Sequence, residues 1–294
     1  MSEIYTDLAY GKINLYLDVL DKMENGYHNV ESVMQSVSLC DRVTLSIDSN
    51  DNTEDNSIEI ICASNKIPND KSNIVFKCAL KFFEHTKITG KNCVFTIEKN
   101  IPVAAGMAGG SSDGAAALRL LNKACGSPLT LTELCKIGAG VGADIPFCLV
   151  GGTCLCKGIG DDITPLRGFK DIFLVSAIDS SSVSTPQAFA LLDEKYGTEC
   201  QRSKNIYDMV NAVNDGSSTL VASNLFNKFE GVITPINENV EAIKSIMISN
   251  GAIGALMSGS GPSVYGLFLD EISQNKAFSA LKNCSINAFL CKTI

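Results

Sequence analysis

The stretch "IPVAAGMAGGSSDGAAALRLLN", residues 101–122, indicates most about the fold. Glycines and serines crowd its first half, and the alanine- and leucine-rich run that follows predicts a helix over 113–125. The first backbone N–H groups of a helix lack partners within the helix and carry a partial positive charge. A loop of small residues in front of them lets an anion approach closely, so the stretch predicts a phosphate-binding loop. A plain capped turn is the alternative.

The composition narrows the class of protein. The chain has 294 residues, a net charge of −8 and no cluster of lysine and arginine, so we expect neither a nucleic-acid nor a membrane partner. It has no apolar run of about 18 residues and no signal-peptide pattern, which predicts a cytoplasmic protein. Twelve cysteines are scattered through apolar patterns, as expected of thiols in a reducing compartment. His28 and His85 leave little room for a histidine-based metal site or a serine triad.

Apolar periodicity predicts a mixture of strands and helices. Strands are expected at 42–47, 57–63, 92–98, 145–156, 171–178, 263–269 and 286–294. Helices are expected at 73–86, 113–125, 130–137, 206–214, 238–250 and 272–283. Thr130 and Glu133 have the spacing of a capping box. The stretch 157–170 mixes glycine, proline and charge, and we expect the junction between two domains there.

Two standard phosphate motifs do not describe the opening loop. A Walker loop requires a lysine, and residues 106–114 contain none. The segment "GAGVGA" at 138–143 has the spacing of a dinucleotide fingerprint, but it follows a predicted helix instead of a strand. A fingerprint without its leading strand is weak evidence for a dinucleotide site.

Four motifs, in order along the chain, resemble those of the GHMP kinase superfamily, which includes galactokinase, homoserine kinase, mevalonate kinase and phosphomevalonate kinase. They are "YGKINLYLDVL" at 10–20, the loop at 101–122, "GAGVGADIPF" at 138–147 and "MSGSGPSVYGLF" at 257–268. The resemblance implies a two-domain α+β fold with the active site in the cleft. It implies a ribosomal protein S5 domain 2-like ATP domain at 1–159 and a ferredoxin-like domain at 160–294.

Two further segments resemble one branch of that superfamily, "NGYHNVESVMQSVSLCDRV" at 25–43 and "STPQAF" at 184–189. The resemblance implies ATP-dependent phosphorylation of the 2-hydroxyl of 4-diphosphocytidyl-2-C-methyl-D-erythritol, in the non-mevalonate route to isoprenoid precursors. ATP with Mg²⁺ is the expected cosubstrate, with no tightly bound cofactor, and the expected assembly is a monomer or a weak homodimer. Two alternatives stay open: a related kinase of homoserine or a mevalonate-like substrate, and a non-catalytic ligand-binding member of the fold.

Two charged residues are the expected catalytic groups. The resemblance assigns Asp144 as the base that takes the proton of the acceptor hydroxyl, and Lys12 as its partner and charge stabiliser. A carboxylate next to a cation suits the deprotonation of an alcohol. Lys12 and Asn14 are two positions apart, so a strand places them on one face, as a shared site requires. Asp144 could otherwise simply cap a helix or turn.

ATP and the cytidyl substrate are assigned to further sets of residues by the same resemblance. The ATP phosphates are assigned to Pro102, Gly106, Met107, Ala108, Gly109, Gly110, Ser111 and Ser112, and the adenine is placed near Asn73, Ile74 and Lys99. The substrate is assigned to Asn14, Tyr27, His28, Thr185 and Phe189. Among these, the rings of Tyr27 and Phe189 would stack on cytosine and His28 would bind its edge. The ligands of a metal ion stay unassigned.

The loop departs from the pattern of the superfamily at two positions that bear on ATP. Ala108 stands where glycine is usual, and Asp113 stands where asparagine is usual. A positive φ at Ala108 would cost about 1 kcal/mol or more. The carboxylate of Asp113 adds a negative charge beside the expected phosphates. We interpret both departures as changes in nucleotide affinity that leave the kinase active.

Overall fold

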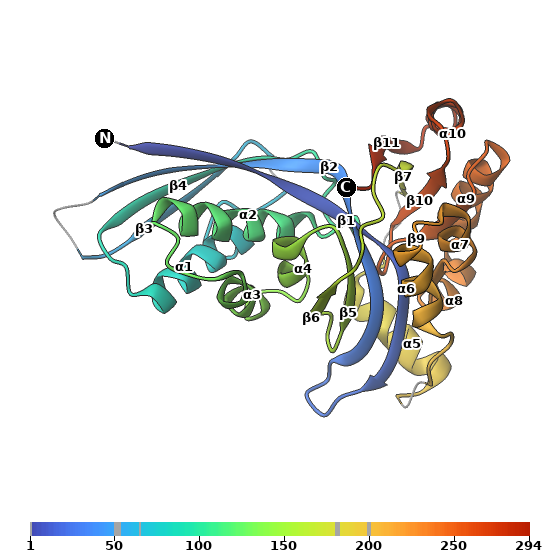
Figure 1. The fold of residues 1–294 in the computed structure, drawn as a ribbon, viewed down its shortest axis with the longest axis horizontal. Coiled ribbons are helices and arrows are strands. Elements are labelled where there is room, and N and C mark those ends of the chain that lie inside the picture. Colours follow the sequence, from blue (N-terminus) through green and yellow to red (C-terminus); the bar gives the residue numbers. More distant parts are fainter. Residues whose placement is uncertain (1, 50–53, 65, 180–182, 199–200) are drawn as a thin grey trace. The chain divides into compact units, whose positions relative to one another are not determined.

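The computed structural model describes residues 2–49, 54–64, 66–179, 183–198 and 201–294 (Figure 1). The chain forms two compact units that are discontinuous in sequence. The first unit comprises residues up to 11, 40–103 and 108–150, and the second comprises 12–39, 104–107 and 151–294. The long strands β1 (Glu3–Lys22) and β2 (His28–Ser49) each contribute to both units. The predicted domain boundary between residues 159 and 160 stays a proposal.

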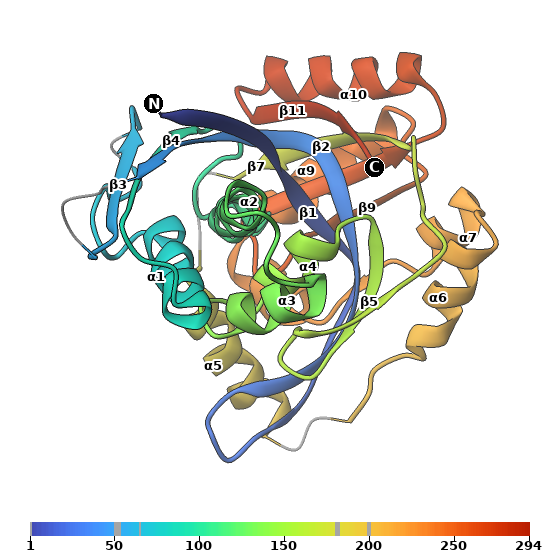
Figure 2. The same ribbon diagram turned by 60° about the vertical axis from the view of Figure 1, so that its left-hand side comes forward.

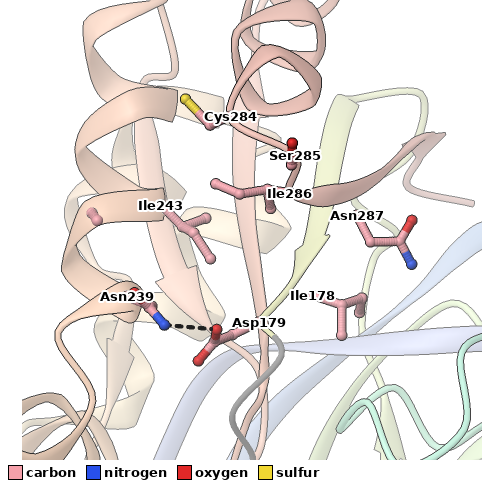
Figure 3. Close-up of a pocket in the computed structure, with 9 residues that line it drawn as sticks. Ile178, Asp179, Asn239, Ile243, Cys284, Ser285, Ile286 and Asn287 are labelled. Carbon is pink, nitrogen blue, oxygen red and sulfur yellow. Dashed lines mark hydrogen bonds between the residues drawn. The ribbon is translucent and has the colours of Figure 1, made fainter.

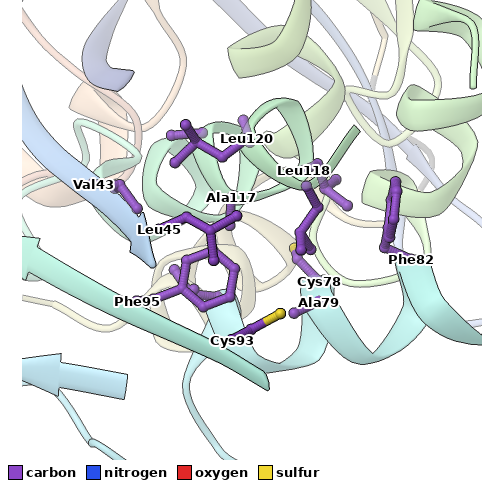
Figure 4. Packing of buried hydrophobic residues seen from close by; sticks show 14 of the residues in the cluster. Val43, Leu45, Cys78, Ala79, Phe82, Cys93, Phe95, Ala117, Leu118 and Leu120 are labelled. Atoms are coloured by element: carbon purple, nitrogen blue, oxygen red, sulfur yellow. The ribbon is translucent and has the colours of Figure 1, made fainter. Parts of the chain in front are cut away.

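The first unit packs helices against a sheet. Its sheet has the order β3-β4-β2-β1, in which β3 (Ser57–Cys62) is parallel to β4 (Lys91–Glu98) and β4 is antiparallel to β2. In β3, β4 and the part of β2 after residue 40, buried residues alternate with less buried ones, and Leu45 and Phe95 in Figure 4 are two of the buried ones. The helices that complete this core are α1 (Ile74–Thr86), α2 (Gly109–Ala124), α3 (Leu131–Ala139) and α4 (Ile145–Val150).

The helix ends of the first unit follow their sequence signals. The Asn73 side chain accepts a hydrogen bond from the backbone N–H of Val75 and so caps α1. At α3, Thr130 and Glu133 form the predicted capping box, in which each side chain accepts a hydrogen bond from the backbone N–H of the other residue. The predicted capping box is therefore confirmed.

The strand predicted over 145–156 is wrong in its first half. Residues Ile145–Val150 form the helix α4, and only Thr153–Lys157 form a strand, β5. The backbone N–H of Cys148 donates to the carbonyl of Asp144, which closes the first helical turn. Gly151 and Gly152 then adopt φ values of +70° and +69°, which end the helix. A short apolar run has no periodicity that separates a strand from a buried helix.

The second unit contains the predicted ferredoxin-like layer. Its four-stranded sheet has the order β11-β7-β10-β9, and every neighbouring pair is antiparallel. The strands are β7 (Phe173–Ile178), β9 (Gly254–Met257), β10 (Ser263–Phe268) and β11 (Asn287–Lys292). The helices α9 (Asn239–Ser249) and α10 (Glu271–Asn283) connect them, and Figure 2 shows α10 alongside β11. This order of strands and helices is that of a ferredoxin-like domain, as predicted.

The remaining elements of the second unit lie outside that four-stranded sheet. They are β6 (Asp162–Pro165), α5 (Thr185–Tyr196), α6 (Ile206–Asn214), α7 (Ser218–Ser223), β8 (Phe226–Asn227), α8 (Glu230–Ile233) and the 3₁₀ helix η1 (Thr234–Ile236). Two of them, β6 and β8, pair with β5 and β1. The helix predicted over 206–214 is confirmed, because α6 has the same bounds. Leu17 and Val19 of β1 and Val30 of β2 lie in the same buried cluster as the ferredoxin-like sheet.

We expect the variant Phe82→Ala to destabilise the first unit far more than Leu80→Ala does. Both residues lie on α1, but Phe82 is fully buried whereas Leu80 is 43% exposed. Removing a buried phenylalanine ring costs about 3–5 kcal/mol, and an exposed helical substitution to alanine changes stability by about 0.5 kcal/mol. Urea denaturation of each variant measures the difference. Equal losses would mean that this core does not depend on the burial of Phe82.

Candidate functional site

Lys12 is held inside the second unit by two hydrogen bonds. Its side chain is only 5% exposed, and its Nζ donates to Oδ1 of Asn14 at 2.8 Å. Its backbone N–H donates to the carbonyl of Met107 at 3.0 Å. The strand β1 therefore places Lys12 and Asn14 on one face, as the spacing predicts, and its backbone at Lys12 is bound to the glycine loop at Met107.

Asn14 is hydrogen-bonded to Lys12 and to several further residues. Its Oδ1 accepts a second hydrogen bond from the backbone N–H of Gly259 at 3.1 Å, and its Nδ2 donates to Oγ of Ser32 at 2.9 Å. The hydroxyl of Tyr265 donates to the Asn14 carbonyl at 2.8 Å. Within the described residues the Nδ2 group makes only the hydrogen bond to Ser32, so Asn14 orients Lys12 and can offer at most one further donor to a ligand. Its assignment to the substrate stays a prediction.

Two of the sequence motifs meet at Gly106. Gly106 has a φ of +72°, and a Cβ added to it would lie 2.6 Å from the carbonyl oxygen of Ser258 and 3.0 Å from that of Gly261. The Ser258 hydroxyl donates to the carbonyl of Gly106 at 3.2 Å. The backbone of the glycine loop thus packs directly on the turn at 257–262. Any side chain at residue 106 would prevent this contact. Sequence reasoning did not assign Ser258 or Gly259 to the site.

The later part of the loop forms the start of α2. Ala108 has a φ of 55° and is the N-cap, and its carbonyl accepts from the backbone N–H of Ser112 at 2.9 Å. The left-handed conformation considered for Ala108 from the sequence is therefore present. The Ser112 hydroxyl is bound to the carbonyl of Tyr10. The N–H groups of Gly109 and Gly110 open the helix, which is where an anion would bind.

Lys99, assigned to ATP from the sequence, lies in a buried ion cluster of the first unit. Its Nζ is 2.7 Å from Oδ2 of Asp113 and is also paired with Asp41. The three side chains are between 0% and 7% exposed. Oδ1 of Asp41 also accepts from the backbone N–H of Ile101 at 2.8 Å, so Asp41 fixes the end of β4 as well. Two carboxylates hold the ammonium group of Lys99, and its contact with ATP stays a prediction.

Asn73 and Ile74, two of the three residues assigned to adenine, lie where α1 begins. The amide of Asn73 is used within its own turn, since it accepts from the backbone N–H of Val75 and its Nδ2 donates to the carbonyl of Pro68 at 2.7 Å. Ile74 lies against α2, with its Cδ1 3.1 Å from the Cβ that Gly110 would carry. The starts of α1 and α2 are therefore adjacent. Of Asn73 and Ile74, it is Ile74 that faces the glycine loop.

Asp144 lies at the start of α4 and is half-buried. Its carbonyl accepts from the backbone N–H of Cys148 at 3.1 Å, so its main chain belongs to the first turn of the helix. Pro102, at the other end of the glycine loop, is also half-buried. The roles predicted for both residues stay predictions.

The residues assigned to cytosine form a cluster in the second unit. The rings of His28 and Phe189 stack, with centroids 4.7 Å apart and planes at 17°. Nε2 of His28 is 2.7 Å from Oδ1 of Asp193, and Oδ2 of Asp193 is 2.6 Å from Nζ of Lys22. Tyr27 is 60% exposed beside them. The structure therefore brings His28 and Phe189 together, and His28 already covers one face of the Phe189 ring.

Asp193 and Lys22, which are partners of this cluster, were missed from the sequence. Asp193 lies four positions after Phe189 on α5, and residues at that spacing share a helix face, which is the signal that could have found it. The capping box of Ser184 and Gln187, with Pro186 between them, marks the start of that helix. Thr185 Oγ1 lies 3.0 Å from Oγ of Ser260, which joins α5 to the turn at 257–262.

A separate cavity of about 400 Å³ lies in the second unit, between α9, the end of β7 and the turn that joins α10 to β11 (Figure 3). Ile243 and Ile286 supply apolar walls, and the Asp179 carboxylate accepts from Nδ2 of Asn239 at 3.0 Å. The described residues that line it include none of those assigned to the site from the sequence.

Comparison with known proteins identifies the family of this chain. The sequence profile of the GHMP kinases N terminal domain matches residues 73–152, and that of the GHMP kinases C terminal domain matches residues 209–287. A curated relative from Clostridium kluyveri is 37% identical over 286 residues, which cover 97% of this chain and 99% of the relative. This chain belongs to the GHMP kinases. It is therefore a small-molecule kinase, and members of the family use ATP.

The named relatives of this GHMP kinase agree with one another. The Clostridium kluyveri protein is a 4-diphosphocytidyl-2-C-methyl-D-erythritol kinase, and so is a relative from Clostridium perfringens that is 38% identical and covers 93% of this chain and 92% of the relative. A solved structure of 4-(cytidine 5'-diphospho)-2C-methyl-D-erythritol kinase has the same fold, with a TM-score of 0.80, 24% identity and coverage of 98% of this chain and 99% of that chain. In the parts of the chain that the structure describes, no helix has the length and apolarity needed to cross a membrane.

We expect Gly106→Ala to cost much more stability than Gly216→Ala. Both glycines lie in the second unit with positive φ, +72° and +67°, but a Cβ at Gly216 meets nothing within 4 Å whereas a Cβ at Gly106 meets backbone at 2.6 Å. The Gly216 variant should lose about 1 kcal/mol for its φ alone. The Gly106 variant should lose that amount plus about 1–3 kcal/mol for overpacking. Urea denaturation compares the two, and similar losses would rule out the close contact.

Proposed function

We propose that this protein transfers the γ-phosphoryl group of ATP to the 2-hydroxyl of 4-diphosphocytidyl-2-C-methyl-D-erythritol. One observation carries the proposal: curated kinases of that name match this chain at 37% identity over 97% of its length. The reaction would belong to the non-mevalonate route to isoprenoid precursors, and we place it in the cytoplasm. The relatives' names favour this substrate over homoserine or a mevalonate-like compound.

The glycine loop would bind the phosphates of ATP. Phosphoryl transfer spreads negative charge over the migrating group, so catalysis is mainly positioning and local positive potential. Gly109 and Gly110 present N–H groups of the first turn of α2, which have no partner within the helix, and Gly106 places no side chain at its own position in the loop. These contacts would orient the triphosphate so that its terminal phosphorus faces the acceptor hydroxyl.

Asp144 and Lys12 would carry the chemistry at that hydroxyl. A tertiary alcohol is a poor nucleophile until it loses its proton, and the half-buried carboxylate of Asp144 would accept that proton. Lys12 would stabilise the negative charge that builds up on the transferred group. Asn14 holds the Lys12 ammonium at 2.8 Å, so the cation would not need to reorganise during the reaction.

Mg²⁺ would enter this site on ATP. Among the residues that the structure describes, no three histidine, cysteine, aspartate or glutamate side chains are grouped so that they could hold a metal ion. The donor set therefore suits an ion held largely by phosphate oxygens and water. When bound, the ion would neutralise charge on the β- and γ-phosphates.

The pair formed by His28 and Asp193 would select cytosine. An ionised carboxylate only accepts hydrogen bonds, so Nε2 of His28 would donate to Asp193. In the tautomer that has its proton on Nε2, Nδ1 would be an acceptor, which matches the exocyclic amine of cytosine and not the carbonyl of uracil. Tyr27, which is 60% exposed, would supply the stacking surface for the base.

A substrate panel tests the proposed function. ADP release is measured with the cytidyl compound, its uridyl analogue, homoserine and mevalonate. We expect turnover of the cytidyl compound, a loss of at least ~1 kcal/mol in kcat/KM for the uridyl analogue, whose carbonyl leaves an acceptor unpaired, and no turnover of the other two. If only homoserine or only mevalonate were turned over, the cytidyl compound would not be the substrate, and the compound that is turned over would take its place. ATP binding without turnover of any compound would indicate a non-catalytic member.

We expect Asp144→Asn to lower kcat by roughly 100-fold or more, because the amide keeps the shape of the side chain but cannot accept the proton. Binding of ATP, measured by calorimetry, should be unchanged. Asp162→Asn is the matched control, since Asp162 is exposed on β6 and has no assigned role. A variant with wild-type kcat, when the chemical step is shown to limit the rate, would exclude Asp144 as the base.

A further inference from the structure

Lys99 lies directly over the first turn of α2. Gly109 opens this helix, and a Cβ on Gly109 would lie 3.3 Å from Nζ of Lys99. Asp113 follows one helical turn later on the same face, and its Oδ2 is 2.7 Å from the same nitrogen. The ammonium of Lys99 therefore lies close to the backbone that opens the helix, and Asp113 holds it there.

The buried cluster of Asp41, Lys99 and Asp113 contains more negative than positive charge. When all three side chains are ionised, two carboxylates face one ammonium. Asp41 is well satisfied, because its Oδ1 also accepts from the backbone N–H groups of Asn100 and Ile101. Asp113 is not: among the described residues, its Oδ1 is buried without a hydrogen-bond partner. The excess charge therefore falls on Asp113.

Protonation of Asp113 would remove that excess. Burial, with the nearby Asp41 carboxylate, raises the pKa of Asp113 from 3.8 to about 7, although Lys99 opposes the shift. Burial alone would lower the pKa of Lys99, but the two carboxylates raise it, so the ammonium stays charged. The thiol of Cys78 on α1 packs against Gly114 of α2, and burial raises its pKa to about 12, so it stays neutral.

We propose that Asp113 sets the affinity for ATP, because its carboxylate opposes the positive potential that Lys99 and the start of α2 offer to the phosphates. Asp113 lies about 6 Å along the helix axis from Gly109. At that range two partly screened charges still interact appreciably. The proposal rests on the proposed function only in that the glycine loop binds ATP. Asp113 acts here through Lys99 and the helix, and it need not touch the nucleotide.

The sign of the pH dependence follows from this arrangement. An anion bound at the start of α2 disfavours the ionised form of Asp113, so ATP binding favours uptake of a proton there. ATP affinity should then fall as the pH rises through the range around 7 in which Asp113 ionises. ATP titrates in the same range, but its own contribution is the same for two proteins measured side by side and cancels in their ratio.

The test measures the Kd of ATP with Mg²⁺ by calorimetry, without an acceptor, for the wild type and Asp113→Asn at pH 6 and pH 8. At pH 8 we expect the variant to bind ATP roughly three- to tenfold more tightly, from the loss of one nearby charge. At pH 6 the ratio should approach one, because Asp113 is then largely protonated in the wild type. If Asp113→Asn does not fold, Asp113→Ser carries the same test.

Asp7→Asn is the matched control, because Asp7 pairs with Arg119 farther along α2 and its removal changes the net charge equally. We expect no change in its Kd for ATP at either pH. Equal or weaker ATP binding by folded Asp113→Asn at pH 8 would overturn the proposal, as would an equal effect of Asp7→Asn. Failure of the proposed function would give a different result. The cytidyl substrate would not be turned over, whereas the ATP titrations would still show the expected difference between wild type and variant.

Discussion

A single buried amide, the side chain of Asn14, organises the proposed catalytic region of the second unit. It is 1% exposed, and its oxygen accepts from both the Lys12 ammonium and the backbone of Gly259. These bonds tie the first motif of the chain to the last. Because a buried amide that loses a partner costs about 1–3 kcal/mol, the turn at 257–262 and the position of Lys12 are coupled. Gly106, which packs on the same turn, brings in the glycine loop.

Much of the fold could be predicted from local pattern, and the exceptions have physical causes. Residues 11–19 of β1 are all buried although polar and apolar residues alternate there, with Lys12, Asn14 and Asp18 in polar positions, so the alternation does not mark one exposed face. A strand was predicted there only for Lys12 and Asn14, from their spacing, and its length was missed. The helix α5 was missed although "STPQ" carries a capping-box signal, because that segment was interpreted only as a substrate motif.

The site was predictable in its motifs and less so in its contacts. The shared face of Lys12 and Asn14 follows from the period of a strand. In contrast, nothing in the sequence placed Asp41 beside Lys99, because they are 58 positions apart and meet only through the pairing of β2 and β4. The same holds for Gly106 and Ser258, whose close approach depends on packing between distant segments. Long-range contacts of this kind have no local signal.

The interleaved course of the chain through its two units bears on how the protein is made. The core of the second unit needs Leu17, Val19 and Val30 together with strands that end at residue 292. During synthesis, the first unit has all of its segments once residue 150 has emerged, whereas residues 12–39 must wait for almost the whole chain. A fragment of residues 160–294 would lack the core residues that β1 and β2 contribute. Cutting the gene once therefore cannot separate the two units as independent folding pieces.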